Sequence, residues 1–291
     1  MPTAQEVTGS RAGRRGPKRS RRTLSLLPRL HVGRERTAGA GTSKESGTSG
    51  WGGNDRVWAE TTRHGRVRDG YPWSVPFLDS VNLGRQRPNP YKESRSTGID
   101  KTPAAGRVEV RAPGPKTVGL GSGLVGDFIG DIENHGGDGQ AVYAFQREDL
   151  DAWQVRLGRS LPNGFFGENL TTRDLEVNEA RLGERWQIGP EVVVEVTSPR
   201  IPCSTFRGWV DEEGWLKVFT AEARPGAYLS VVTPGTIAAG DEVEIIHRPD
   251  HGITIALAFR ALTTDRELLP RLLEVGDALD PELRESASGV S

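Results

Sequence analysis

The sequence predicts a mainly β protein: a barrel of short strands with a few helices, a small C-terminal helical module and a disordered N-terminal tail. Short β-favouring runs recur between turns, and 37 glycines with 19 prolines supply turn formers along the 291 residues. Charge divides unevenly, because residues 1–74 hold 15 basic and 6 acidic residues whereas the remainder holds 23 and 33. We therefore expect a basic tail over 1–74, a barrel over 75–248 and a short helical module over 249–291.

The N-terminal tail has no sustained apolar period. Basic residues cluster between Arg11 and Arg22, and a Gly/Ser/Thr-rich stretch follows from Gly39 to Gly53. This composition cannot bury enough apolar surface to offset the loss of conformational entropy, so it predicts a solvated, disordered segment. Two other interpretations stay open. In the first, the tail is an Arg-rich segment for targeting or for nucleic-acid attachment. In the second, residues 1–74 are a mis-assigned extension and the true start of the protein lies near Val75, since Met1 is the only methionine.

The barrel region contains five runs typical of strands. The clearest is β-branched, with glutamates flanking valines, and the others alternate or are rich in aromatic and β-branched residues. Glycine and proline turns punctuate them, which favours a barrel or sandwich over a parallel sheet with crossover helices. The expected strands are Arg107–Arg111, Ala141–Phe145, Glu191–Thr197, Ala227–Thr233 and Glu242–His247.

Helical periodicity appears in three places. Arg147–Leu157 places Leu150, Trp153 and Leu157 on one face, and Glu213–Ala223 has a similar apolar stripe. The tail from Ile253 to Leu283 predicts two or three short helices, one of them capped by Thr264 or Asp265.

Several classes of protein are excluded by composition. No apolar run reaches the roughly 18 residues of a membrane span, so we expect a cytoplasmic protein without a membrane partner. A single cysteine excludes an intramolecular disulfide framework and a thiolate-rich zinc site. The chain also lacks a phosphate-binding P-loop, a dinucleotide-binding glycine motif, a GxSxG elbow and a His/Glu zinc motif.

Cys203 is the first candidate functional residue. It lies in a Pro-Arg-Ile-Pro-Cys loop directly after the clearest strand, and the two prolines restrict the backbone that presents the thiol. Arg200 stands three residues away and favours the thiolate, the form that binds soft metals and attacks sulfur. The alternative is a lone buried cysteine that acts as a small apolar side chain.

Two polar segments upstream carry the other candidates. His135 precedes Gly136 and Gly137, which allow a sharp turn and a close approach to a ligand, and histidine can donate or accept a proton near neutral pH. Asp127 and Asp131 could orient His135, or could cap turns. Gly167, Glu168, Asn169 and Thr171 lie in the hexapeptide Gly167–Thr172. This polar cluster could bind a heterocycle or phosphate, although the hexapeptide alone is weak evidence.

Taken together and in this order, these residues resemble the MOSC family, named for the C-terminal domain of molybdenum cofactor sulfurase. The resemblance is closest to the bacterial stand-alone branch that includes the hydroxylaminopurine-resistance proteins, which often carry a three-helix module after the domain. It covers about residues 77–248. The matching stretches are Val81–Gly84, Ser96–Lys101, Gly123–Asp127, His135–Gly137, Ala141–Tyr143, Phe166–Thr172, Ile188-Gly189, Pro199–Cys203 and Ala239–Asp241.

The resemblance implies a β-barrel with a pocket for the molybdenum cofactor, a molybdopterin with a dithiolene and a phosphate. It implies that Cys203 ligates molybdenum or carries sulfur, and that His135 occupies the second position of the family's His-His-Gly-Gly. Asn134 replaces the first histidine, and Ser96 stands where some relatives carry an acidic residue. Asp127, Gly136, Gly137, Gly167, Glu168, Asn169, Thr171 and Arg200 are the expected cofactor-binding residues. Pyridoxal phosphate binding enters only through the family's general description.

Three hypotheses for the function follow from this set. The first is a molybdenum-dependent reductase of small N-hydroxylated compounds, in which Cys203 holds the metal and His135 handles a proton. Its electrons must come from a redox protein, because the chain has neither a cysteine set for an iron–sulfur cluster nor a flavin motif. The second is a sulfur carrier that forms a persulfide on Cys203 with a cysteine desulfurase as partner. The third is nucleic-acid association through the Arg-rich tail, ranked last because the rest of the chain is acidic.

Overall fold

The computed structural model describes residues 75–92 and 96–289. The predictions made for the tail over residues 1–74 lie outside the described residues. All of the described residues belong to one compact unit.

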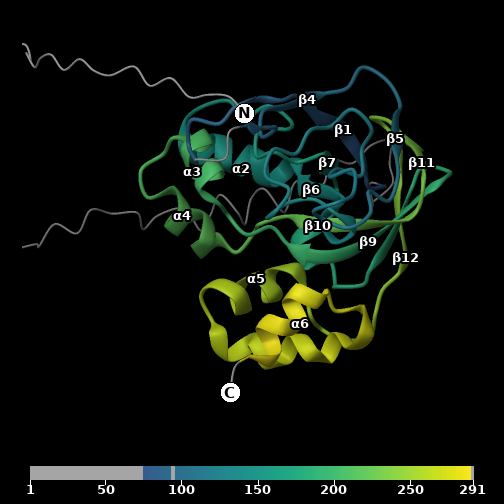
Figure 1. Cartoon of the computed structure of the whole chain (residues 1–291), viewed down its shortest axis with the longest axis vertical. Coiled ribbons are helices and arrows are strands. Elements are labelled where there is room, and N and C mark those ends of the chain that lie inside the picture. Colours follow the sequence, from purple (N-terminus) through teal and green to yellow (C-terminus); the bar gives the residue numbers. More distant parts are fainter. Residues whose placement is uncertain (1–74, 93–95, 290–291) are drawn as a thin grey trace, which may run out of the picture. The chain divides into compact units, whose positions relative to one another are not determined.

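A mixed sheet of eight strands forms the centre of the fold (Figure 1). Its order is β12-β8-β9-β10-β6-β7-β1-β4, and β6 and β7 form its one parallel pair. These strands are β1 (Phe77–Gly84), β4 (Lys101–Pro103), β6 (Val142–Gln146), β7 (Leu170–Arg173), β8 (Arg185–Ile188), β9 (Val192–Pro199), β10 (Ala227–Thr233) and β12 (Val243–His247). Two small sheets pair β2 (Arg87–Pro88) with β3 (Ser96–Thr97), and β5 (Val108–Val110) with β11 (Gly235–Ile237).

The large sheet curls so that its two ends approach each other. Phe77 at the start of β1 forms a bridge with Glu242, directly before β12. The Leu78 amide donates to the Asp241 carbonyl at 2.9 Å, and the Val243 amide donates to the Pro76 carbonyl at 2.8 Å. The barrel does not close fully, because among the described strands no continuous ladder of hydrogen bonds joins β12 to β1 or β4. The predicted mainly β, barrel-type fold is confirmed as an incompletely closed barrel.

The strands with the strongest local patterns appear as predicted. β10 and α2 (Arg147–Leu157) have the predicted bounds, and β9 runs two residues further, to Pro199. Sequence analysis missed β1 and β7 because buried polar residues interrupt their apolar pattern. Ser80 and Asn82 on β1 and Thr171 on β7 are at most 4% exposed and bond to one another or to neighbouring polar groups.

The interior has two apolar parts. The aliphatic part fills the barrel, and the aromatic part lies where α2 meets α3 (Ser204–Val210) and α4 (Trp215–Glu222). Phe166 and Trp153 belong to the aromatic part, where the Trp153 and Trp215 rings pack with centroids 4.7 Å apart. This packing fixes α3, the helix that begins directly after Cys203. Two short 3-10 turns complete the barrel region, η1 (Asp138–Gln140) and η2 (Val177–Glu179).

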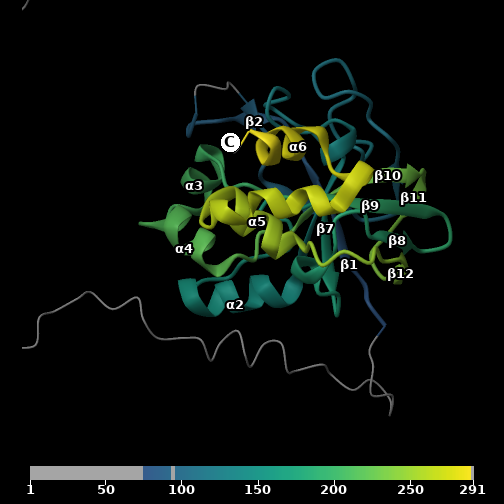
Figure 2. The same ribbon diagram turned by 90° about the horizontal axis from the view of Figure 1, so that it is seen from below.

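Three C-terminal helices cover one face of the sheet, as the view from below shows (Figure 2). They are α5 (Ile255–Thr263), the kinked η3 (Arg266–Ala278) and α6 (Pro281–Ser288). Ile255 and Ala258 of α5 are fully buried within the aliphatic part of the barrel interior. Within the described residues, no helix has the length and apolar character that a membrane crossing requires.

Asp265 occupies the predicted N-cap position, that of η3, but it makes no side-chain capping hydrogen bond. Its carboxylate accepts hydrogen bonds from the Arg260 guanidinium instead of from helix amides. Thr254 caps α5 by accepting from the Leu257 amide, and Asp280 caps α6.

Candidate functional site

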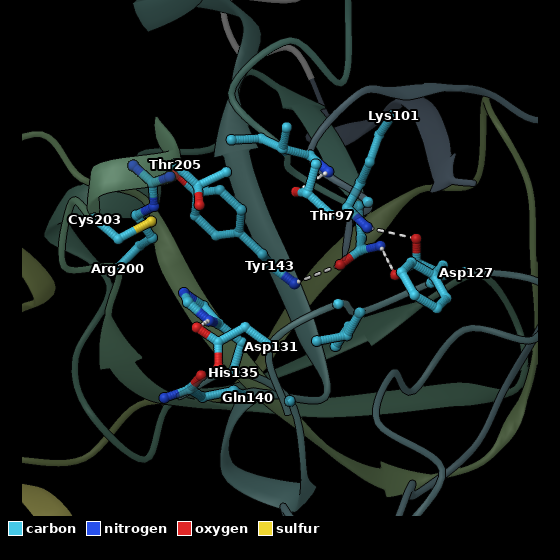
Figure 3. A pocket seen from close by; sticks show the side chains of 18 of the residues that line it. Thr97, Lys101, Asp127, Asp131, His135, Gln140, Tyr143, Arg200, Cys203 and Thr205 are labelled. Atoms are coloured by element: carbon cyan, nitrogen blue, oxygen red, sulfur yellow. Dashed lines mark hydrogen bonds and ion pairs between the residues drawn. The ribbon is translucent and has the colours of Figure 1, made fainter. Parts of the chain in front are cut away.

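A cleft opens beside β6, between the loop after β9 and the segments before β4 and β6 (Figure 3). It holds about 710 Å³ of empty space, a figure that includes the part open to solvent. Its walls come from segments more than 100 residues apart. The lining residues are Asn89, Ser96, Thr97, Gly98, Ile99, Lys101, Asp127, Phe128, Ile129, Gly130, Asp131, His135, Gly136, Gln140, Tyr143, Phe166, Gly167, Asn169, Arg200, Cys203, Thr205 and Tyr228.

Cys203 lines this cleft from the junction of β9 and α3. The strand ends at Pro199, and the extended backbone of Cys203 forms the N-cap of α3, whose Arg207 amide donates to the Cys203 carbonyl at 3.0 Å. The two prolines and this first helical turn fix the position from which the side chain leaves the backbone. Figure 3 shows the sulfur beside Arg200 and Thr205, and Cys203 is partly rather than fully buried.

The surroundings of Cys203 favour the thiolate. Burial by itself would raise the pKa of the thiol. A hydrogen bond with His135, the charge of Arg200 and the Phe206 backbone amide outweigh burial and lower that pKa to about 6. A cysteine with such a pKa is largely ionised at neutral pH, and thiolate is the form that binds metal or acts as a nucleophile. The alternative of an inert, fully buried cysteine does not fit these surroundings.

We expect alkylation of Cys203 in the cofactor-free protein to become half-maximal near pH 6, because the thiolate fraction rises as pH passes through the pKa. Cys203 is the only cysteine, so mass spectrometry after timed iodoacetamide exposure reports its rate directly. His135→Gln should move the midpoint upward, since a hydrogen bond that stabilises the thiolate is altered. A wild-type midpoint above pH 8 would contradict this environment.

His135 is held by a tight loop. Gly136 and Gly137 have φ values of 83° and 76°, and a Cβ on Gly136 would lie 2.6 Å from the Gly121 carbonyl oxygen. Asp131 accepts from Lys92 Nζ at 2.6 Å and lies 3.9 Å from His135 Nδ1. Asn134 is exposed and donates to the same carboxylate. Asn134 thus supports Asp131 rather than standing in for a second histidine in the cleft.

Asp127 forms the centre of a buried polar network at the other end of the cleft. Its side chain is 1% exposed and forms an ion pair with Lys101, whose side chain is 7% exposed. The carboxylate also accepts from the Gly84 amide at 2.7 Å, the Ser122 hydroxyl at 2.7 Å and Asn169 Nδ2 at 2.9 Å. Asn169 in turn accepts from the Tyr143 amide, so this network ties β1, β4, β6 and the start of β7 together.

Glu168 is one of the expected cofactor-binding residues. It is fully buried and does not line the cleft. Its carboxylate accepts from the Gly164 amide at 2.5 Å, the Phe166 amide at 3.0 Å and the Thr171 hydroxyl at 3.0 Å. Burial raises the pKa of Glu168 to about 7, although these hydrogen bonds oppose the rise. Glu168 and Thr171 therefore shape the turn that presents Gly167 and Asn169.

We expect Glu168→Ala to lower the free energy of unfolding by about 3 kcal/mol, because it orphans two buried amides and a hydroxyl. Glu168→Gln retains an acceptor and removes a costly buried charge, so its cost should be about 1 kcal/mol. Urea denaturation followed by tryptophan fluorescence measures both. Equal stabilities for the alanine variant and the wild type would show that the carboxylate does not support this turn.

The cleft brings together most of the predicted site residues: Asp127, His135, Gly136, Gly167, Asn169, Arg200 and Cys203. Gly137, Glu168 and Thr171 lie outside its lining. Sequence reasoning missed Tyr143, Tyr228 and Gln140, which looked like strand and turn residues. Lys101 lies in the matching stretch Ser96–Lys101, but no local signal marks its pairing with Asp127, 26 residues away.

Comparisons with known proteins show to which family the chain belongs. The sequence model of the MOSC domain matches residues 131–244. YflK of Bacillus subtilis (strain 168) is 32% identical over 183 residues, which cover 62% of this chain and 78% of YflK. The chain belongs to the MOSC domain family. The family match begins at Asp131, so the cleft walls contributed by residues 89–130 lie before it.

Two further comparisons extend this result. A crystal structure of YiiM from Geobacillus stearothermophilus superposes with a TM-score of 0.59 at 26% identity, covering 73% of this chain and 97% of that one. The structural match thus extends well beyond residues 131–244. A protein of Gibberella moniliformis (strain M3125 / FGSC 7600) named "Reductase" is 27% identical over 132 residues, which cover 44% of this chain but 23% of that protein.

Proposed function

We propose that this MOSC protein binds the molybdenum cofactor in the cleft and reduces small N-hydroxylated compounds. The observation that carries the proposal is the Cys203 thiol, whose pKa is lowered to about 6 at the wall of an open cleft. Thiolate is a soft ligand suited to such a metal. Membership of the MOSC family and the reductase name of one relative agree with this chemistry.

The residues present fit a metal that brings its own ligands. Among the described residues, no group of three or more His, Cys, Asp or Glu is arranged to hold a bare metal ion. A dithiolene-bearing pterin supplies most of the ligands itself, so the protein needs to contribute one thiolate. Buried polar atoms without a protein partner at the cleft, Gln140 Oε1 and Arg200 Nη1, suit the heteroatoms of such a ligand.

The side chains of the cleft would have different roles. Cys203 would hold the metal, and Lys101, Asp127 and Asn169 would line the pterin end as a pre-formed polar wall. When bound, the cofactor supplies the two electrons that cleave an N–O bond to an amine and water. The reaction also consumes two protons, and His135, hydrogen-bonded to Cys203 and near Asp131, is placed to deliver one of them. The electrons come from a separate redox protein.

The test is protein made in a host that synthesises the cofactor. We expect near-stoichiometric molybdenum by elemental analysis, pterin fluorescence after release, and reduction of hydroxylamine with an artificial electron donor. Protein that remains free of molybdenum and pterin under these conditions would refute the proposed function.

A sulfur carrier is the second candidate, because the same partly buried thiolate can accept sulfur from a persulfide. Incubation with a cysteine desulfurase and cysteine should then add one sulfur to Cys203, which intact-mass spectrometry detects. That adduct in protein that binds no molybdenum would favour the carrier over the reductase.

A further inference from the structure

Arg200 offers the cleft an unused hydrogen-bond donor rather than an unbalanced charge. Its positive charge lies near Cys203 and stabilises the thiolate, so the charges of the two side chains balance each other. The residue is 5% exposed and lines the cleft, but its Nη1 has no hydrogen-bond partner among the described residues. A buried N–H without an acceptor costs free energy, and a small molecule that accepts from it removes that cost.

Two donors are fixed beside the Cys203 sulfur, as Figure 3 shows. The Arg200 guanidinium is held by packing, because its Cζ lies 3.5 Å from the centroid of the Phe206 ring, a cation–π distance. Thr205 supplies the second donor. Its hydroxyl lines the cleft and accepts from Asn89 Nδ2 at 3.0 Å, so the hydroxyl hydrogen can be donated to a molecule in the cleft.

A nucleophilic sulfur beside two donors suits a small neutral electrophile whose leaving atom is oxygen. A further anion is disfavoured there, because the thiolate already balances the guanidinium charge. When a thiolate attacks a hydroperoxide, the O–O bond breaks and negative charge develops on the departing oxygen. Donors fixed near that oxygen stabilise the developing charge and accelerate the reaction. The cleft opens to solvent, so peroxide can enter it.

We propose that hydrogen peroxide binds to Arg200 Nη1 and the Thr205 hydroxyl in the cofactor-free protein and oxidises Cys203 to a sulfenic acid. An electron pair of the sulfur forms the S–O bond as the O–O bond breaks, and the second oxygen leaves as hydroxide, which takes a proton from solvent to become water. Sulfur is oxidised by two electrons and the peroxide is reduced by two. This modification goes beyond the proposed function and does not depend on molybdenum binding.

Reversal of the modification requires an external thiol, because the sequence holds no second cysteine. A small thiol would condense with the sulfenic acid to form a mixed disulfide and water, and a second equivalent would release the Cys203 thiol.

The test compares two reagents on the same cofactor-free protein. Intact-mass spectrometry follows the loss of the Cys203 thiol to hydrogen peroxide, with dimedone trapping the sulfenic acid, and separately its loss to iodoacetamide. The ratio of the two rates cancels the ionised fraction of the thiol. We expect Arg200→Met to lower this ratio at least about tenfold, because one donor to the developing charge is lost.

Thr205 provides a matched pair of variants. Thr205→Val removes the hydroxyl at nearly constant shape and should lower the ratio by about threefold or more, whereas Thr205→Ser keeps the hydroxyl and should retain the wild-type ratio. Arg271→Met is the control for loss of an arginine, since Arg271 lies on the surface of η3 and pairs with Glu274. An unchanged ratio in folded Arg200→Met or Thr205→Val would overturn the proposal.

A measurement on the wild type avoids any folding defect of the variants. Unfolding in urea separates Cys203 from both donors, so the folded protein should show a ratio at least about tenfold above that of the unfolded chain. A folded-state ratio no higher than the unfolded one would also overturn the proposal.

Discussion

Cys203→Ser is expected to lower the molybdenum content of protein made in a cofactor-competent host by at least roughly tenfold. Substituting a residue that only hydrogen-bonds a metal ligand already lowers metal affinity by about that factor, and Cys203 is the proposed ligand itself. Serine has nearly the shape of cysteine, but its hydroxyl stays protonated at neutral pH and is a hard donor. Hydroxylamine reduction should fall to background with it. Molybdenum is measured by elemental analysis and normalised to protein.

Two other variants make this result interpretable. His135→Gln should retain molybdenum while losing most of its turnover, because it changes a proton donor rather than the ligand. Val155→Ala, on the exposed face of α2, should match the wild type in both measurements. Wild-type metal loading in Cys203→Ser would remove Cys203 as the ligand, whatever the activity.

Asp127→Asn should lower the free energy of unfolding by about 3–5 kcal/mol, the usual cost of breaking a buried ion pair by neutralising one partner. The substitution keeps the shape of the side chain but leaves the Lys101 ammonium, 7% exposed, without its counter-charge. The Gly84 amide and the Ser122 hydroxyl would also face a weaker acceptor. Urea denaturation measures the loss as a lower midpoint.

A double-mutant cycle with Lys101→Met isolates the charge pair. The double variant should be more stable than the sum of the single losses predicts, because no unpaired ammonium remains. Thr117→Ala, on an exposed loop, serves as a neutral control. Strict additivity, or a fully stable Asp127→Asn, would show that the pair does not hold β1, β4 and the cleft wall together.

The sequence predicted well where a local pattern carries the information. β10 and α2 have the predicted bounds because alternation and helical spacing are expressed within each segment. The restricted loop that presents Cys203 was also predicted, since its prolines lie within the loop itself and its strand ends directly before it. β1 and β7 escaped because their buried faces include Ser80, Asn82 and Thr171, whose burial is satisfied by partners that no local pattern reveals.

By itself, the sequence determined the fold class, the family resemblance, and the candidacy of Cys203 and His135, because residue type and spacing are enough for each. Only the tertiary structure decided that Glu168 and Thr171 support a turn, and that Lys101 pairs with Asp127. The physical reason is that charge neutralisation and burial depend on which strands become neighbours. The curl of the sheet, and not any stretch of sequence, sets those neighbours.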